Sequence, residues 1–365
     1  MKINILLPHK EKFDEKKTSS VSITVKNNLF YTNFLKDIKI YGQYVENPLF
    51  SDNFVGAKYS ILSLKSKTRF LTDIMLKTIS KSNDKKQLIE IHNRPNLVDY
   101  IAKASCFPIS LFLHNDPLNM KGSKSIDQRK KLLEKCSAVF CVSKFVKKQF
   151  LNGVSIGNQK VHVLYNGVES QLKYFPTKKK EVLFVGRLVY EKGAMLYADV
   201  VKSIATDFPD WNFGLLGSSD EMYNKNKNAY AYQVVEKFIS IGSQAKVYGF
   251  KNHGFVREKM QNGSIIVIPS LCEEAFGLVA AEAMSNGMAI IASKVGGIPE
   301  IVEDNGILIS NINYLKLKRS LVDIMKDKEK RELLQKKAWL NFTHSSEKSS
   351  KNLDCFRRII FQRHF

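Results

Sequence analysis

The chain lacks long hydrophobic segments and paired cysteines, and each absence argues against a class of protein. No apolar run in the 365 residues reaches the ~18 residues that a transmembrane helix requires. The short apolar stretch at residues 3–8 ends at Pro8 and is followed by charged residues, which predicts a first strand rather than a signal peptide. The five cysteines include no Cys-x-x-Cys pair and no metal-ligand spacing. We therefore expect reduced thiols, a cytoplasmic location and no metal site.

The composition that is present is that of an ordinary globular protein, with 44% hydrophobic and 25% charged residues. A single hydrophobic core stops growing at about 250–300 residues, so the length of the chain predicts two domains. We find no short repeat and no low-complexity segment.

Charge is the most unusual property, because 57 Lys and Arg residues stand against 35 Asp and Glu, a net charge of +22. Residues 1–170 carry 28 basic and 14 acidic residues, and the remainder carries 29 and 21, so the first part is the more basic. Such a surplus indicates an anionic partner, namely nucleic acid, anionic lipid or a phosphorylated substrate. The alternative is a lysine-rich composition on solvated faces. No nucleic-acid reader motif is present, so we expect no nucleic-acid partner.

Continuous apolar runs alternate with segments of helical spacing along the whole chain, which predicts buried parallel strands and an α/β fold. In the first half the predicted strands are residues 3–8, 88–91, 109–113, 138–142 and 161–165. In the second half they are residues 181–185, 211–216, 246–248, 264–268, 289–292 and 306–309.

The two series of strands are separated by a polar stretch that contains Pro176. We expect a first Rossmann-like domain at 1–168, a linker at 169–180 and a second Rossmann-like domain at 181–344, the domains facing each other over a cleft. Residues 345–365 are predicted to form a basic amphipathic helix, which either packs back on the first domain or is a separate peripheral helix.

The first motif with chemistry follows the predicted strand at 264–268. An acidic loop with Glu274 leads to Gly277, which opens an Ala-rich helix that contains Glu282. A helix that starts after a parallel strand presents free backbone amides to a phosphate. The alternative is that Glu274 only complements the helix dipole and that Glu282 is a solvated helix residue.

The second motif follows the strand at 181–185, where Arg187 and Lys192 leave the carboxyl end of the sheet between Gly186 and Gly193. Ligands of open α/β sheets bind outside these ends. Arg offers a planar fork to phosphate oxygens and Lys a point charge, so the pair suits a diphosphate.

Together these motifs resemble the family 4 glycosyltransferases of the GT-B fold. The resemblance rests on Gly186-Arg187-Leu188, Glu191-Lys192-Gly193 and the pair Glu274 and Glu282. It is supported by Val142-Ser143, Tyr165-Asn166-Gly167-Val168 and Val295-Gly296-Gly297-Ile298-Pro299-Glu300. It is specific over residues 161–309 and looser over the first domain.

The resemblance implies roles for individual residues. Arg187 and Lys192 would bind the donor diphosphate, together with backbone amides around Phe276, Gly277 and Leu278. Glu274 would lie beside the transferred sugar and Glu282 would bind the ribose hydroxyls. In the first domain, His114 best matches the histidine that the family places near the sugar, and we take His114 and Glu274 as the catalytic candidates.

The acceptor side is less clearly marked. His92, Asn93 and Arg94 follow the strand at 88–91 and would share the rim with His114, so we consider them acceptor contacts, or else parts of a structural turn. Family members commonly carry a Gly-rich loop after the first strand, and residues 9–22 contain no glycine. Ser19 and Ser20 would then serve with their hydroxyls at a helix start.

The resemblance implies a retaining hexosyltransferase that uses a nucleotide-diphosphate sugar and a glycan or lipid-linked acceptor, in lipopolysaccharide or other envelope polysaccharide synthesis. No Asp-x-Asp motif is present, so we expect no metal requirement and no other cofactor. The alternative is a non-catalytic sugar- or nucleotide-binding paralogue. Basic residues together with apolar residues on a short helix predict peripheral contact with the anionic inner membrane, or else a solvated face. The basic residues are Lys121, Lys124, Arg129, Lys130, Lys131, Lys135, Lys144, Lys147 and Lys148.

Overall fold

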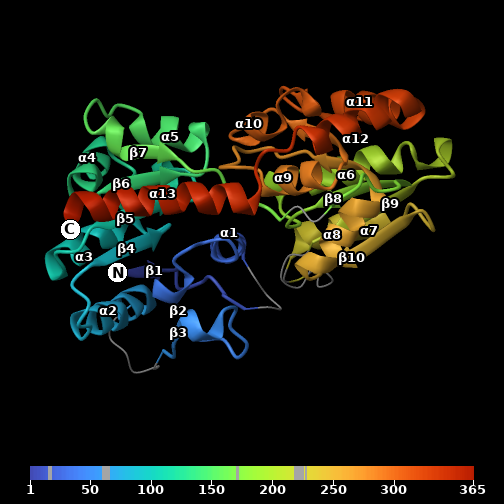
Figure 1. The fold of residues 1–365 in the computed structure, drawn as a ribbon. Helices are drawn as coiled ribbons and strands as arrows, with labels where there is room; N and C mark the ends of the chain where they lie inside the picture. The colour runs from blue at the N-terminus through green and yellow to red at the C-terminus, as the bar shows by residue number, and fades with distance from the viewer. Residues whose placement is uncertain (15–18, 60–65, 170–171, 218–225, 227) are drawn as a thin grey trace. The chain divides into compact units, whose positions relative to one another are not determined.

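The chain divides into two compact units, each built on one parallel sheet (Figure 1). The computed structural model describes residues 1–14, 19–59, 66–169, 172–217, 226 and 228–365. Unit 1 comprises Met1–Gly167 and His344–Phe365, and unit 2 comprises Val168–Thr343. The predicted fold class, α/β with two Rossmann-like domains, is confirmed.

The sheet of unit 1 has seven strands in the order β3-β2-β1-β4-β5-β6-β7. Its strands are β1 (Lys2–Leu6), β2 (Ile38–Gln43), β3 (Phe54–Ala57), β4 (Gln87–His92), β5 (Ile109–Leu113), β6 (Ala138–Cys141) and β7 (Val161–Val163). β1 is hydrogen-bonded to β2 on one side and to β4 on the other. The strands that follow in sequence are added first on the β2 side and then on the β4 side. This is the topological switch point of unit 1.

Helices cover the sheet of unit 1, and the core is made of apolar side chains of the strands. The helices are α1 (Ser20–Leu29), α2 (Lys67–Ser80), α3 (Val98–Ala104), α4 (Ile126–Lys135), α5 (Lys144–Leu151) and α13 (Ser346–His364). One face packs strand residues such as Ile3 and Ile40 against Val25 of α1 and Leu353 of α13. Strands buried on both faces explain why the sequence shows continuous apolar runs rather than alternation.

Two strands of unit 1, β2 and β3, were not predicted. Lys39 in β2 is exposed, and β3 pairs only with β2 at the edge of the sheet, where only one of its four residues is buried. Their runs are therefore short and mixed, without the continuous apolar pattern of a central strand.

The C-terminal helix α13 belongs to unit 1 although it follows unit 2 in sequence. It packs against α1 (Figure 1). The Ser345 hydroxyl accepts a hydrogen bond from the Lys348 amide and caps the start of the helix. The buried Arg357 guanidinium donates two hydrogen bonds to the Glu90 carboxylate, both 2.8 Å long.

The sheet of unit 2 has six strands in the order β10-β9-β8-β11-β12-β13, and β8 lies between β9 and β11 at its switch point. The strands are β8 (Lys179–Val185), β9 (Asn212–Leu216), β10 (Ala245–Gly249), β11 (Gly263–Ile268), β12 (Ala289–Ser293) and β13 (Ile307–Ile309). The helices are α6 (Ala194–Lys202), α7 (Ala229–Ile239), α8 (His253–Asn262), α9 (Leu278–Ser285), α10 (Ile298–Val302), α11 (Tyr314–Lys326) and α12 (Lys328–Leu340).

Unit 2 begins at Val168 and so includes the predicted linker. β8 begins at Lys179, and the Lys178 amine donates hydrogen bonds to the carbonyl oxygens of Met260, Gln261 and Asn286 at 2.6–3.0 Å. These carbonyls lie at the C-terminal ends of α8 and α9. Carbonyl oxygens at the end of a helix receive no hydrogen bond from an amide of the same helix. Lys178 thus ties the segment just before β8 to two helix ends.

None of the helices in the described part of the chain combines the length and the hydrophobicity that a membrane span requires.

Candidate active site

The candidate donor site lies at the carboxyl ends of β8 and β11, the two strands at the switch point of unit 2. Arg187 follows β8 after Gly186, and the acidic loop with Glu274 follows β11. Parallel neighbouring strands end at the same edge of a sheet, which places the two motifs at the position where open α/β sheets bind ligands.

A close backbone contact brings Lys192 to Glu274. Gly193 has a φ of +68°, and a Cβ at this position would lie 2.0 Å from the Pro269 carbonyl oxygen, so only glycine fits. The Leu271 amide donates a 2.8 Å hydrogen bond to the Glu191 carbonyl and joins the same two loops. As a result the Lys192 ammonium forms an ion pair with the Glu274 carboxylate.

Glu274 is held from two further directions. The Ser270 hydroxyl donates a 2.6 Å hydrogen bond to its Oε1. The Gly297 amide donates a 2.7 Å bond to its carbonyl oxygen, and a Cβ on Gly296 would lie 2.0 Å from that oxygen. The glycine pair of the motif at 295–300 therefore serves to support the Glu274 loop.

The helix α9 starts directly after this loop. The amides of Ala280 and Ala281 donate to the Gly277 carbonyl, which leaves the amides of the first two helical residues, Leu278 and Val279, without an acceptor inside the helix. Phe276, just before the helix, is buried. A helix start of this kind favours an anion.

Arg187 is exposed, and its guanidinium forms no hydrogen bond or ion pair with any residue that the structure describes. It differs in this from Lys192, whose charge is already paired. The site thus offers one uncommitted cation, one paired cation and a helix start at one edge of the sheet.

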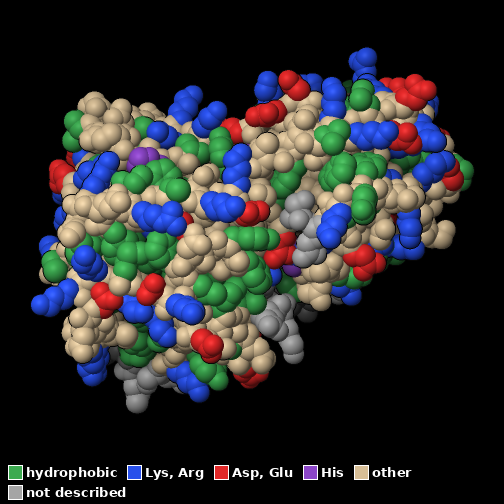
Figure 2. Space-filling view, in the orientation of Figure 1, with side chains coloured by type: hydrophobic (Ala, Val, Ile, Leu, Met, Phe, Trp, Pro, Cys, Tyr) green, Lys and Arg blue, Asp and Glu red, His purple; other side chains and the backbone are tan. Residues whose placement is uncertain are grey.

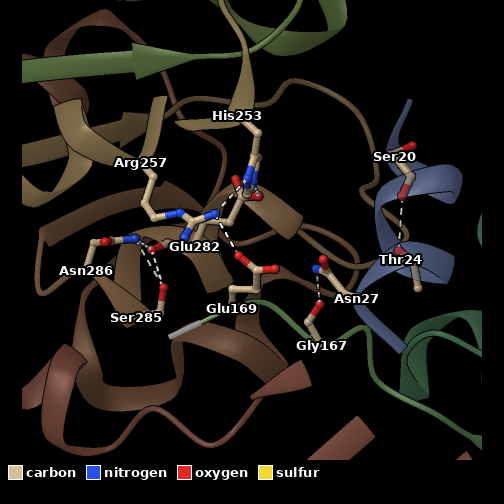
Figure 3. A network of polar contacts seen from close by, with 10 residues as sticks. All are labelled: Ser20, Thr24, Asn27, Gly167, Glu169, His253, Arg257, Glu282, Ser285 and Asn286. Carbon is tan, nitrogen blue, oxygen red and sulfur yellow. Dashed lines mark hydrogen bonds and ion pairs between the residues drawn. The ribbon is translucent and has the colours of Figure 1, made fainter. Parts of the chain in front are cut away.

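Glu282 is not a solvated helix residue, because only 8% of it is exposed. His253 of α8 lies with its Nε2 2.7 Å from Glu282 Oε1. The Arg257 guanidinium, one turn further along α8, lies 2.7 Å from a Glu169 carboxylate oxygen and 3.5 Å from His253 Nδ1 (Figure 3). Next to this network is a small hollow lined by these four side chains and their neighbours.

His253, Arg257 and Glu169 were missed by sequence reasoning. The spacing of His253 and Arg257 places both on one face of α8. That pattern alone does not reveal that the face meets Glu282.

In unit 1, His92 is the last residue of β4, His114 directly follows the neighbouring strand β5, and the two side chains contact each other. His92 Nδ1 lies 2.9 Å from His114 Nε2, and the two rings are stacked. Burial lowers the pKa of His114 to about 4, and burial together with the His114 and Arg357 charges holds the pKa of His92 well below its usual value. Both imidazoles are therefore neutral at pH 7.

Asn93 has a structural role. Its backbone φ is +52°, a conformation that Asn tolerates. Its side-chain Oδ1 accepts a 2.8 Å hydrogen bond from the His114 amide. Asn93 thereby fixes the backbone that carries His114.

The other acceptor-side candidates are near the N-terminal end of α1. Ser19 is its N-cap residue, and the Ser19 hydroxyl donates to the Glu11 carboxylate. Ser20 is the exposed first residue of the helix. Arg94 is half-buried and its charge counteracts the effect of burial on Glu11, whose pKa is raised mainly by desolvation. Sequence reasoning gave no role to Glu11.

The expectation that Arg129 belongs to a basic surface is wrong. Its side chain is buried, and its guanidinium donates to the carbonyl oxygens of Ser123, Lys124 and Asn152. Five donors in a rigid fork suit this clamping task. In the described part of the chain, no group of three or more His, Cys, Asp or Glu side chains is arranged to hold a metal ion.

Comparisons with known proteins fit this geometry. The chain matches the family model "Glycosyl transferases group 1" over residues 169–339 and the model "Glycosyltransferase Family 4" over residues 57–172. It is similar to the solved structure of Anabaena HepE in complex with UDP and glucose, with a TM-score of 0.76, 18% identity, and coverage of 98% of this chain and 100% of that one. This likeness agrees with the predicted GT-B fold.

Two relatives show closer sequence similarity over part of the chain. An uncharacterized glycosyltransferase of Methanocaldococcus jannaschii is 34% identical over 198 residues, 54% of this chain and 52% of that protein. The lipopolysaccharide 1,2-N-acetylglucosaminetransferase of Salmonella typhimurium is 27% identical over 183 residues, 47% of this chain and 48% of that protein. The chain thus spans about half the length of each relative. Since the two matched models together run from residue 57 to residue 339, the chain belongs to the glycosyltransferase family that they describe.

Proposed function

We propose that the protein is a retaining, metal-independent glycosyltransferase, which moves a hexose from a nucleotide-diphosphate sugar to a glycan or lipid-linked acceptor. Support for the donor class comes from the family and from HepE, which was solved with UDP and with glucose. The acceptor class is supported by the Salmonella relative, which is named for its action on lipopolysaccharide.

One observation carries the proposal. Arg187, which is exposed and has no described partner, and Lys192 lie with the start of α9 at the switch point of unit 2. In glycosyl transfer, negative charge grows on the leaving diphosphate, and fixed positive groups at that position lower the barrier most. Arg187, Lys192 and the α9 amides would supply this charge without a metal ion.

The two glutamates have distinct environments that suit distinct roles. Glu274 orients the Lys192 ammonium and, in this proposal, lies beside the transferred sugar. Glu282 is buried and bonded to His253 through one oxygen, so its other oxygen is the group we assign to the ribose hydroxyls.

On the acceptor side, we keep Ser19, Ser20, His92, Asn93 and Arg94 as candidate contacts, with His114 nearest to the sugar. Because His114 is neutral at pH 7, its proposed task is to hydrogen-bond a hydroxyl group rather than to supply a positive charge.

Peripheral contact with an anionic membrane remains part of the proposal, without Arg129. Figure 2 shows Lys and Arg side chains distributed over the visible face and interspersed with Asp and Glu, rather than gathered in one patch. The exposed apolar residue Ile126 at the start of α4, between basic residues such as Lys124 and Lys130, is the feature that favours a membrane surface.

The test is turnover with a panel of UDP-, GDP- and ADP-sugars in the presence of a chelator, measured as release of the nucleoside diphosphate. We expect one class of donor to be used, and Arg187→Ala to lower the rate by about 10²–10³-fold, as for loss of one charge-stabilising group. Arg319→Ala, which removes an exposed arginine of α11, is the matched control.

Three results would count against the proposal. Strict dependence on added metal would contradict the metal-independent mechanism. Equal rates for Arg187→Ala and Arg319→Ala would remove the assigned diphosphate site. Nucleotide binding without any turnover would favour the alternative, a non-catalytic binding paralogue.

A further inference from the structure

The carboxylate of Glu282 is held through one oxygen and open at the other. His253 Nε2 lies 2.7 Å from Glu282 Oε1. Within the described ranges of the chain, the second oxygen, Oε2, has no partner, and it is not enclosed, so a ligand can reach it. Only 10% of the Glu282 side chain is exposed. Because so little of this side chain is free to move in solvent, the residue that holds Oε1 also determines the direction of Oε2.

Arg257 determines which nitrogen of His253 carries the proton. Its guanidinium forms a 2.7 Å ion pair with Glu169 and lies 3.5 Å from His253 Nδ1, within hydrogen-bonding distance (Figure 3). An arginine side chain donates hydrogen bonds but cannot accept them, so His253 Nδ1 has to be the acceptor. The proton of the imidazole is then on Nε2. The 2.7 Å contact is therefore a hydrogen bond that His253 donates to Glu282.

The helices that carry this pair are fixed on several sides. The Asn252 side chain caps the start of α8, directly before His253. The Lys178 amine joins the C-terminal ends of α8 and α9 through hydrogen bonds to their carbonyl oxygens. The Asn286 side chain donates a 2.7 Å hydrogen bond to the backbone carbonyl oxygen of Glu282. The backbone on both sides of the pair is thus held, as a preorganised binding group requires.

We propose that His253 is a positioning residue for the nucleotide. With its proton on Nε2 it holds Glu282 so that Oε2 accepts a hydrogen bond from a ribose hydroxyl, and Arg257 maintains that tautomer. The inference rests on the proposed function, in which Glu282 binds the ribose, and adds two residues that act through Glu282. A carboxylate that is already oriented loses little conformational freedom when the nucleotide binds, which increases affinity.

Nitrogen-15 NMR of the histidine side chains tests the tautomer in the full chain without nucleotide. The His253 signals are those that disappear in His253→Gln. We expect a protonated Nε2 and an unprotonated Nδ1, and a proton on Nδ1 of the wild type, alone or together with one on Nε2, would overturn the proposal. In Arg257→Leu, combined with Glu169→Gln to avoid an unpaired carboxylate, part of the rings should carry the proton on Nδ1. An unchanged tautomer there would overturn the role of Arg257.

Three variants of His253 separate positioning from packing. His253→Gln keeps an N–H close to the place of Nε2, and His253→Leu keeps similar bulk without a donor. If His253→Leu does not fold, His253→Asn takes its place, because its amide is too short to reach Glu282. His364→Leu, which removes an exposed histidine of α13, is the matched control. Each protein is titrated with the nucleoside diphosphate that binds the wild type and with its 2′- and 3′-deoxy analogues.

The readout is the ratio of the Kd of the weaker deoxy analogue to that of the parent nucleotide. We expect about tenfold or more in the wild type, His364→Leu and His253→Gln. In His253→Leu the ratio should fall close to one, because the parent nucleotide binds more weakly while the analogue binds as before. A residue that only packs between the helices would weaken both nucleotides alike. A ratio that persists in His253→Leu, or is lost in His253→Gln, would overturn the proposal.

Failure of this inference can be told apart from failure of the proposed function. If the wild type binds no nucleotide, or if Arg187→Ala binds it equally well, the donor site is wrong and the inference is wrong with it. If nucleotide binding depends on Arg187 but the ratio does not depend on His253, the donor site stands and only the positioning role is wrong.

Discussion

Among single residues, Glu282 illustrates how burial changes the meaning of a charge. In an Ala-rich helix a glutamate could be a solvated surface residue, but here it is buried and paired with His253. A buried carboxylate is retained at a cost unless its oxygens are used. We therefore assign its remaining acceptor capacity to a ligand.

We expect Glu282→Gln to abolish discrimination between a nucleoside diphosphate and its 2′- and 3′-deoxy analogues. The wild type should bind the parent nucleotide about tenfold or more tightly than the weaker analogue, because a hydrogen bond to a carboxylate contributes roughly 1.5–3 kcal/mol. Titration calorimetry measures the ratio. Glu329→Gln, an exposed glutamate of α12, is the control, and an unchanged ratio in Glu282→Gln would contradict the ribose assignment.

His114 should make unit 1 less stable in acid. Its pKa is about 4 in the folded chain and about 6.5 in an unfolded one. The stability that its neutral form provides is thus fully present above pH 6.5 and is lost as the pH falls toward 4, by up to about 3 kcal/mol.

Calorimetry at pH 7 and pH 4.5 tests this statement. For a unit of this size, a change of 1 kcal/mol in the free energy of unfolding shifts the Tm by roughly 2–4 °C. The Tm of the wild type should therefore fall by several degrees more than that of His114→Asn. Parallel declines for the two proteins would show that His114 is not the group that titrates.

Among the elements, α13 stands out because it joins unit 1 from the far end of the chain. Arg357 is buried between Glu90 of β4 and Asp354 one turn earlier in α13. Asp354 also accepts hydrogen bonds from the Thr32 hydroxyl and the Asn33 amide, each 2.8 Å long. The network therefore connects the helix both to the sheet and to the segment after α1.

Arg357→Met should destabilise this attachment by about 3–5 kcal/mol, because it leaves the Glu90 carboxylate buried without a cation. Hydrogen exchange of residues 346–364 should rise strongly, and adding Glu90→Gln should restore part of the protection. Arg363→Met, an exposed change on the same helix, is the control. Equal exchange in Arg357→Met and Arg363→Met would mean that apolar packing alone holds α13.

For the whole molecule, the central strands were predictable because burial on both faces leaves a continuous apolar run. The predicted strand at 109–113 has the bounds of β5. The edge strands β2 and β3 lack that run, and so they were missed. The motifs around Arg187 and Glu274 could be recognised in the sequence because close backbone contacts there require glycine at fixed positions near these residues.

What could not be predicted depends on contacts between distant segments. The sequence marks Arg129 as one basic residue among many, whereas the fold surrounds it with three carbonyl oxygens. Likewise, nothing local shows that His253 meets Glu282, or that Arg257 meets Glu169. The net charge of +22 does not show which basic side chains are buried and which are exposed.

The most direct measurement is titration calorimetry of UDP, GDP, ADP and CMP into the metal-free wild type, Arg187→Ala and Arg319→Ala. The account predicts that one nucleoside diphosphate binds the wild type and Arg319→Ala equally. Arg187→Ala should bind it about 10- to 100-fold more weakly, because it lacks a charge-assisted hydrogen bond to the diphosphate. Failure of every nucleotide to bind the folded wild type, or equal binding by Arg187→Ala, would contradict the donor site at the ends of β8 and β11.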